Sequence, residues 1–188
     1  MDHYLDLRLR ADPEIPAFDL MSALFGKLHR ALARMSNAPI GVSFPDHNAK
    51  APHLGLCLRL HGTSVALSAL LATDWLQGVR DHVHAADIQT VPADALHRRV
   101  YRVQAKSSPE RLRRRAMRRH GIDADAARQR IPDSAAEALR LPFVTLGSRS
   151  TGQPSFNLYI QHGPTQPTPL AGELNAYGLS KTATVPWF

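Results

Sequence analysis

The sequence predicts an α+β protein of two domains, and three observations support this. The first ninety residues alternate strand-like and helix-like patterns in the order βαββαβ, residues 92–96 interrupt them, and basic residues cluster just afterwards. We therefore expect a ferredoxin-like domain over residues 1–92 and a smaller α/β domain over residues 97–188, with an Arg-rich helix at about residues 108–120. A chain of 188 residues that is 44% hydrophobic has enough apolar side chains for a core.

The first domain begins with a strand and a long helix. Leu5, Leu7 and Leu9 alternate with charged residues, which is the period of a half-buried strand. Residues 18–35 predict a helix, and a short strand at residues 40–44 ends before Pro45, where a loop begins. The apolar residues on one arc of the helix are Met21, Leu24, Phe25, Leu28, Leu32 and Met35.

Three further elements complete the first domain. Alternating leucines predict a strand over residues 54–60, and Thr63 or Ser64 can cap a helix that follows. A last strand is expected over residues 83–91. The resulting βαββαβ order is that of the ferredoxin-like fold, which serves many RNA-binding modules and many unrelated proteins.

The second domain is expected to combine helices and strands. Residues 100–106 read as extended, and Ser108, Pro109 and Glu110 predict the start of a helix that Gly121 ends. Asp123 opens a short helix bounded by Pro132, residues 134–139 add one more turn, and the chain from Leu141 onward is strand-like.

The charge of the chain is concentrated in residues 98–119. This stretch holds ten of the 23 Lys and Arg residues and one acid, Glu110, which gives +9, while the remaining 13 basic and 15 acidic residues give −2. Such a cluster indicates a polyanionic partner, and we expect a nucleic acid. On a helical wheel one broad face carries Arg111, Arg114, Arg115, Arg118 and Arg119, whereas Arg113 points away and Leu112 and Ala116 can dock the helix. The alternative is a solvated charged face.

Arg102 and Gln104 precede the basic helix on an extended segment, so their side chains are expected on one side. Arg pairs with guanine and Gln with adenine, so the two residues can read neighbouring purines while the helix holds phosphates. The equally supported alternative is the polar outer face of a strand. A basic helix fits the DNA major groove, but the absence of zipper heptads favours a structured RNA.

Four further side chains are candidates for chemistry or contact. His29 lies at the edge of the apolar arc beside small residues, and a neutral imidazole can accept a proton near pH 7, although a hydrogen-bonded His at a helix–sheet border is the commoner situation. Ser148 and Ser150 can orient a ribose or hold a phosphate, or merely form a turn. Phe156 alternates with apolar residues, which favours a core residue over a platform on which a base stacks. For Tyr177 both interpretations, a core residue and a functional contact, remain open.

Several classes of protein are not indicated. The chain has no apolar run long enough to span a membrane, and charges interrupt any signal-peptide core at its start. Cys57 is the single cysteine, which predicts no internal disulfide and a reducing cytoplasm. Ten histidines show no tight ligand spacing, so no metal or other cofactor is expected.

Taken together, the segments resemble the CRISPR repeat-processing endoribonuclease of type I-F systems along essentially the whole chain. The resemblance is carried by MDHYLD at 1–6, LFGKLH at 24–29, GVSFP at 41–45, RVQAKS at 102–107, PERLRRR at 109–115, PFVTL at 142–146, STGQ at 150–153, YGLSK at 177–181 and VPWF at 185–188.

The resemblance implies that the protein binds one repeat hairpin in precursor CRISPR RNA. It implies metal-independent cleavage at the 3′ base of the stem by the 2′-hydroxyl, which leaves a 2′,3′-cyclic phosphate and a 5′-hydroxyl. His29 would act on the hydroxyl proton, Ser148 would hold the ribose and Tyr177 would position His29. Arg102 and Gln104 would read the last stem purines, Phe156 would stack below the stem, and the basic helix would enter the groove through Arg114, Arg115, Arg118 and Arg119.

The resemblance also implies that the protein keeps the processed RNA and joins other type I-F CRISPR-associated proteins in the surveillance complex. Two alternatives remain: a non-catalytic subunit that binds the hairpin, and, more distantly, a DNA-binding regulator that uses the basic helix in the major groove.

Overall fold

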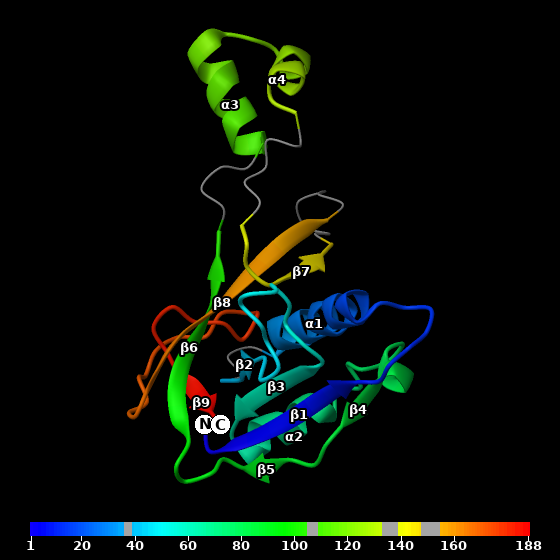
Figure 1. Cartoon of the computed structure of the whole chain (residues 1–188), viewed down its shortest axis with the longest axis vertical. Helices are drawn as coiled ribbons and strands as arrows, with labels where there is room; N and C mark the ends of the chain where they lie inside the picture. Colours follow the sequence, from blue (N-terminus) through cyan, green and yellow to red (C-terminus); the bar gives the residue numbers. More distant parts are fainter. Residues whose placement is uncertain (36–38, 105–108, 133–138, 148–154) are drawn as a thin grey trace. The chain divides into compact units, whose positions relative to one another are not determined.

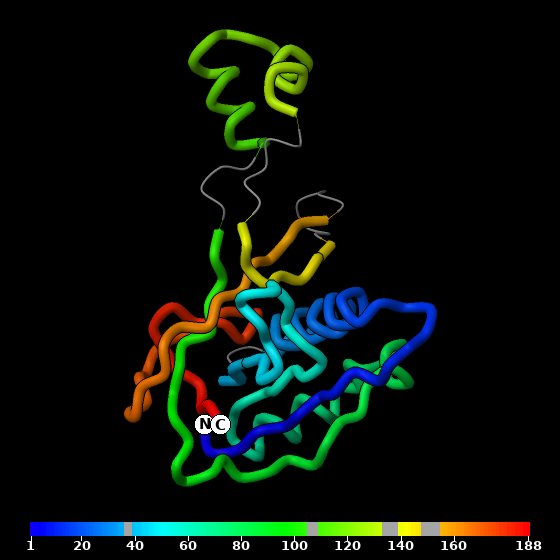
Figure 2. Tube along the Cα trace, viewed as in Figure 1, coloured from blue at the N-terminus to red at the C-terminus, as the bar shows by residue number. Residues whose placement is uncertain are grey.

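The computed structural model describes residues 1–35, 39–104, 109–132, 139–147 and 155–188 (Figures 1 and 2). The chain divides into one unit of Met1–Val103 with Leu141–Phe188 and a second unit of Gln104–Arg140. Within the described residues, no helix combines the length and the apolar character that a membrane-spanning segment needs.

The first sheet of the larger unit is antiparallel and has the strand order β2-β3-β1-β4, with β5 also paired to β1. Its elements are β1 (His3–Leu9), α1 (Ala17–Arg34), β2 (Gly41–Ser43), β3 (Cys57–Gly62), α2 (Ser64–Leu71), the 3₁₀ turn η1 (Arg80–His82), β4 (Val83–Ala85) and β5 (Gln89–Thr90). The predicted βαββαβ order is confirmed.

One face of this sheet is apolar and meets the helices in the core. Leu5 pairs with Leu60 and Leu7 with Leu58, and all four side chains are fully buried. The predicted apolar arc of α1 lies against the same core. Thr63 caps α2 by accepting a hydrogen bond from the amide of Ala66, as the sequence predicts.

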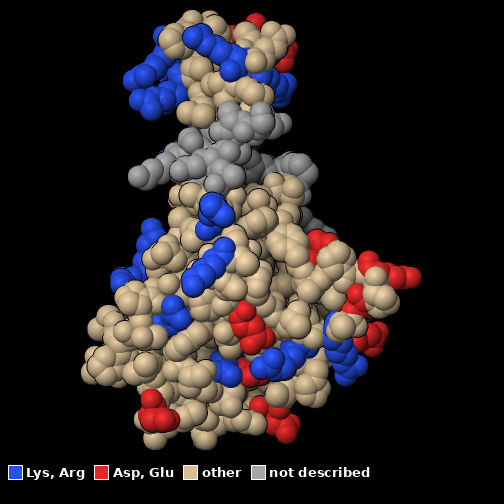
Figure 3. Space-filling model, viewed as in Figure 1, with Lys and Arg blue, Asp and Glu red and all other residues tan. Residues whose placement is uncertain are grey.

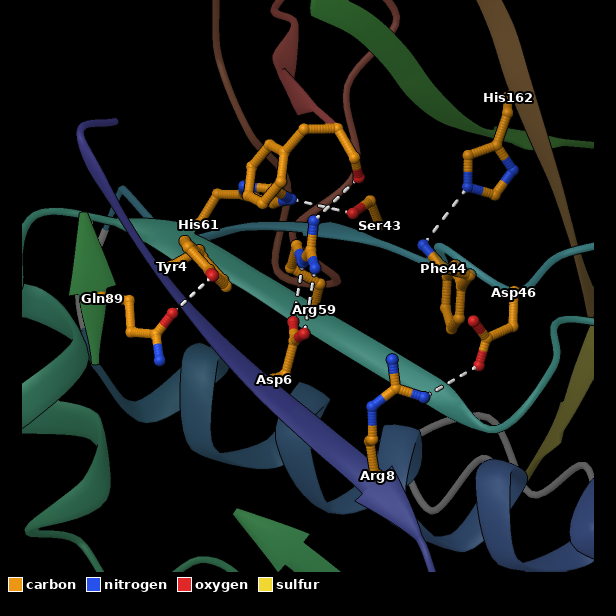
Figure 4. A network of polar contacts seen from close by, with 11 residues as sticks. Tyr4, Asp6, Arg8, Ser43, Phe44, Asp46, Arg59, His61, Gln89 and His162 are labelled. Carbon is orange, nitrogen blue, oxygen red and sulfur yellow. Dashed lines mark hydrogen bonds and ion pairs between the residues drawn. The ribbon is translucent and has the colours of Figure 1, made fainter. Parts of the chain in front are cut away.

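The other face of the first sheet holds buried polar groups that the alternation pattern did not predict (Figure 4). The Arg59 guanidinium donates to both carboxylate oxygens of Asp6, at 2.7 and 2.9 Å, and to the backbone oxygen of Phe188 at 3.2 Å. The Phe188 ring lies 4.1 Å from the Arg59 guanidinium carbon. Residues from the C-terminal end of the chain therefore cover a face that a solitary sheet would expose to water.

The second sheet belongs to the same unit and shares its core. It is antiparallel, and its strand order is β7-β8-β6-β9. The strands are β6 (Leu96–Val103), β7 (Phe143–Leu146), β8 (Phe156–Gln166) and β9 (Val185–Trp187). Helix α1 packs against β7, and this contact joins the first sheet's helix to the second sheet.

The smaller unit consists of α3 (Pro109–His120) and α4 (Ala124–Arg130), which pack against each other. Pro109 begins α3, and the amide of Gly121 donates to the carbonyl of Met117 at its end. Asp123 caps α4 by accepting from the amide of Ala126 at 2.8 Å. The predicted helix ends are thereby confirmed, except that Ser108 lies outside the described residues, as does most of the turn expected at 134–139.

Three predicted extended segments differ from the observed strands. The segment expected over residues 100–106 is observed as β6, which begins at Leu96 and ends at Val103. The strand expected over residues 54–60 begins at Cys57, because Gly55 has φ +78° and a Cβ there would lie 2.3 Å from that of Asp46. The strand expected over residues 83–91 is divided into β4 and β5. The domain boundary near residues 92–96 remains a prediction: each sheet lies on its own side of it, but both sheets belong to one contact unit.

Candidate functional site

His29 lies on α1 and is half-buried. Its Nδ1 is 2.9 Å from the carbonyl oxygen of Ala176. A carbonyl oxygen only accepts hydrogen bonds, so Nδ1 carries the proton in the neutral ring and Nε2 is left as the acceptor. No described residue hydrogen-bonds to Nε2. The ring therefore has one fixed nitrogen and one nitrogen able to take a proton.

The ring of Tyr177 stacks on that of His29. Their centroids are 4.0 Å apart and their planes differ by 16°. Tyr177 is also parallel to Phe25, with centroids 6.3 Å apart and planes within 2°. Phe25 and His29 are one turn apart on α1, so Tyr177 lies along the face of the helix that carries both. The Tyr177 ring therefore covers one face of the imidazole.

A tight turn holds Tyr177 and the Ala176 carbonyl in place. The side-chain oxygen of Asn175 accepts from the amides of Tyr177, at 2.9 Å, and Leu179, at 3.2 Å. Gly178 has φ +71°, and a Cβ there would lie 2.8 Å from the Val42 side chain. Its carbonyl accepts from the amide of Val42 at 3.0 Å. Strand β2 thus fixes the turn that orients His29.

Helix α1 and strand β7 approach closely over the two turns before His29. The hydroxyl of Ser22 accepts from the amide of Thr145 at 3.1 Å, and a Cβ on Gly26 would lie 3.4 Å from the Leu146 side chain. Strand β7 ends at Leu146 and is followed by Gly147. The predicted residues Ser148 and Ser150 come next in the chain and lie outside the described residues.

Arg102 and Phe156 are brought together by the pairing of β6 with β8. The Arg102 guanidinium carbon is 5.7 Å from the centroid of the Phe156 ring. Phe156 is half-buried and packs against the core, as its alternation predicts. The Arg102 Nε is buried and has no hydrogen-bond partner among the described residues. Gln104 is exposed and follows directly after the end of β6 at Val103.

The basic helix α3 has the two faces that its sequence predicts. Arg113 is half-buried, and its Nε donates to the carbonyl of Ile131 at 2.8 Å. Leu112 and Ala116 are half-buried on the same side. The exposed arginines of the helix are Arg111, Arg114, Arg115, Arg118 and Arg119. Figure 3 shows Lys and Arg side chains gathered on the surface of this helical unit.

Comparison with known proteins identifies the family. Residues 4–188 match the family described as CRISPR-associated protein Cas_Csy4. This chain belongs to that family. It is 56% identical to the CRISPR-associated endonuclease Cas6/Csy4 of Pseudomonas aeruginosa (strain UCBPP-PA14) and 44% identical to the protein of the same name from Escherichia coli (strain UTI89 / UPEC), in both cases over the full length of both chains. The predicted resemblance to the type I-F family is confirmed.

Two features of this Csy4-family site were missed from the sequence. One is the Ala176 carbonyl, which fixes the tautomer of His29. The other is the Asn175 side chain, which organises the turn. The succession Asn-Ala-Tyr-Gly at residues 175–178 is itself a turn signal, because Asn bonds nearby backbone amides and Gly tolerates positive φ. Nothing in that signal indicates that the turn lies beside His29, 147 residues away along the chain.

No group of three or more His, Cys, Asp or Glu side chains in the described part of the chain is arranged to hold a metal ion. Cys57 is buried, and burial raises the pKa of its thiol to about 12, with Asp6 adding to the shift. A thiol with such a pKa stays protonated at neutral pH and is a poor nucleophile.

Proposed function

We propose that this Csy4-family endonuclease binds the repeat hairpin of precursor CRISPR RNA and cuts it at the 3′ base of the stem. The observation that carries the proposal is the His29 ring, with Nδ1 on the Ala176 carbonyl and Nε2 left as an acceptor. RNA contains its own nucleophile in the 2′-hydroxyl, so the protein needs to align the strand and move protons.

The reaction follows from that tautomer. Nε2 of His29 takes the proton of the 2′-hydroxyl upstream of the cut, and the 2′-oxygen bonds to phosphorus as the bond to the leaving 5′-oxygen breaks. A proton taken up by the leaving oxygen completes the balance, giving a 2′,3′-cyclic phosphate and a 5′-hydroxyl. Ser148 would hold the ribose for in-line attack, and Tyr177 would keep the imidazole facing it. Each of these roles matches the family resemblance.

RNA binding is assigned to the remaining predicted residues. The exposed arginines of α3 would contact phosphates in the groove of the stem, because guanidinium groups bind phosphate bidentately. Arg102 and Gln104 would read the purines at the base of the stem, Phe156 would stack below it, and Ser150 would contact the backbone. A cation–π contact between Arg102 and Phe156 would keep the Arg102 guanidinium near the ring that stacks below the stem.

The first sheet supports a ferredoxin-like N-terminal domain, because an antiparallel order of β2-β3-β1-β4 is the arrangement that a βαββαβ chain of that fold adopts. We further propose that the protein keeps the cleaved hairpin, joins other type I-F CRISPR-associated proteins and acts in the cytoplasm. The family resemblance implies the retained hairpin, the protein partners and the compartment.

The direct test is cleavage of the host's repeat RNA in EDTA by the His29→Ala variant. We expect its rate to fall by roughly 10²-fold or more while hairpin binding is retained. His84→Ala, an exposed histidine on β4, is the matched control and should cleave normally. A 2′-deoxy sugar upstream of the cut should block cleavage by the unaltered protein.

Undiminished cleavage by His29→Ala would remove His29 from the mechanism. If the unaltered protein binds the hairpin tightly and cuts nothing, it is instead the non-catalytic subunit. Tight binding of duplex DNA with weak binding of the hairpin would favour a regulator.

A further inference from the structure

A pocket of about 310 Å³ opens between α1 and the segment that follows α2. Its volume is at the lower end of the range for ligand sites. One side of the pocket is formed by α1 and includes three basic residues. The other side is formed by residues 73–77, between α2 and η1. The lining residues are Lys27, Arg30, Ala31, Arg34, Met35, Thr73, Asp74, Trp75 and Gln77.

The charge of this pocket is unbalanced. Arg30 and Arg34 are exposed, and neither has an ion-pair partner among the described residues. Lys27 donates through Nζ to the backbone carbonyl of Gln77, which leaves its charge in place. Asp74 is the one acidic residue among those described as lining the pocket, and its carboxylate pairs with Arg80. The pocket therefore presents three cations and one carboxylate that is already paired.

The pocket lies on the helix that carries the candidate catalytic residue, on a neighbouring face of that helix. Lys27, Arg30 and Arg34 share one face of α1, since three and four residues separate successive members. Arg30 follows His29 in the chain, and its Nη1 is 3.7 Å from where a Cβ on Gly26 would lie. Gly26 is one turn before His29, so the Arg30 guanidinium and the imidazole belong to the same stretch of helix. An RNA strand that continues from His29 around the helix would therefore meet Arg30 first, and Lys27 and Arg34 lie farther around.

We propose that this pocket binds a backbone phosphate of the RNA on the 3′ side of the cut. The inference rests on the proposed function, which assigns residues to the stem and to its base but none to the strand that leaves. That strand carries a phosphate at every nucleotide, and the two exposed guanidinium groups match phosphate better than ammonium groups would. Trp75 supplies an apolar wall to the same pocket. The flanking strand is thus held on the helix that carries His29.

The test compares two hairpin RNAs, each with a 2′-deoxy sugar upstream of the cut so that neither is cleaved. One ends a single nucleotide past the cut, and the other continues for eight more. We expect the extension to strengthen binding to the unaltered protein by about fivefold, the upper end for ion pairs open to solvent. The variant R30A/R34A should lose most of that gain, and the salt dependence of the gain should flatten by about 0.7 for each phosphate released.

The matched control is R10A/K50A, which removes two exposed cations of the same unit that lie outside the pocket and should keep the full gain. An equal gain in R30A/R34A and the control overturns the proposal, as does an extension that adds nothing to binding by the unaltered protein. If the double variant does not fold, R34E, at the last residue of α1, serves for the same comparison. Failure of the proposed function is distinguishable, because the unaltered protein would then fail to cut the unmodified repeat hairpin, whether or not the extension strengthens binding.

Discussion

The ion pair of Arg59 with Asp6 is a residue-scale feature whose energetic effect can be measured. The side chains of Arg59 and Asp6 are 10% and 14% exposed, so each charge depends on the other for compensation. Arg8 lies on β1, as Asp6 does, and pairs with Asp46 at 3.5 Å. Both side chains of this second pair are well exposed, at 54% for Arg8 and 39% for Asp46. The two pairs differ mainly in burial.

We therefore predict that Asp6→Ala lowers the free energy of unfolding by about 3 kcal/mol, because it leaves the Arg59 charge buried without its partner. Arg8→Ala should lower it by less than about 1 kcal/mol, because water screens an exposed pair. Urea unfolding followed by circular dichroism measures both. Equal losses in the two variants would show that burial of the Arg59 pair has no energetic consequence.

Tyr177 allows a second prediction at this scale. Tyr177→Ala removes the ring stacked on His29 and should slow single-turnover cleavage by roughly tenfold to a hundredfold, since misplacing a catalytic group by about 1 Å can have that effect. Tyr177→Phe keeps the stack and should retain most of the rate. Hairpin affinity, measured in parallel, should change little in either variant. A Phe variant as slow as the Ala variant would mean that the hydroxyl, and not the stack, is what matters.

At the scale of the element, the role of helix α3 in RNA binding can be tested through the salt dependence of the affinity for the hairpin. Arg115→Ala removes one exposed cation and should reduce the slope of log affinity against log salt by roughly 0.7 to 0.9, the value for one phosphate. The control is Arg128→Ala on α4, because Arg128 already pairs with Asp125 at 3.3 Å. An unchanged slope for Arg115→Ala in a filter-binding or anisotropy titration would remove that phosphate contact.

Elements that are defined by local pattern were predictable from the sequence, and elements that are defined by distant contacts were not. The apolar arc of α1 and the two faces of α3 follow from periodicity, which local sequence fully contains. The first residue of β3 depends on Gly55 lying against Asp46, a contact between separate segments. Alternation alone assigns Arg59 to a solvent-facing side, because it cannot show that Phe188 covers that face.

The same distinction applies to the candidate site. His29 and Tyr177 are identifiable as candidates one by one, whereas their stacking depends on how β2 holds the turn at residues 175–179. The residue types of a site can thus be read from the sequence. The tautomer of His29 cannot, because it depends on a backbone carbonyl, which every residue has.

At the scale of the whole molecule, buried histidines link folding to pH. His61 is fully buried on β3, where its Nε2 is 2.8 Å from the hydroxyl of Ser43. Burial lowers its pKa to about 3, with the Arg59 charge adding to the shift. His162 on β8 adds in the same direction, since burial lowers its pKa to about 2, with His47 and Arg98 contributing. Both rings are therefore neutral in the folded protein at pH values where they would be protonated in the unfolded chain.

The sign of the effect follows from proton uptake. Between pH 6.5, the ordinary value for histidine, and about 3, the unfolded chain binds a proton at His61 that the folded protein does not, so stability falls as the pH falls. Between pH 7 and pH 5 this residue should account for a loss of about 2 kcal/mol in the free energy of unfolding. Urea titrations at the two pH values should show a smaller difference for His61→Gln than for the unaltered protein. His84→Gln, which changes an exposed histidine, should leave the difference unaltered, and a His61→Gln variant with the same pH dependence as the unaltered protein would mean that His61 is not neutral in the folded state.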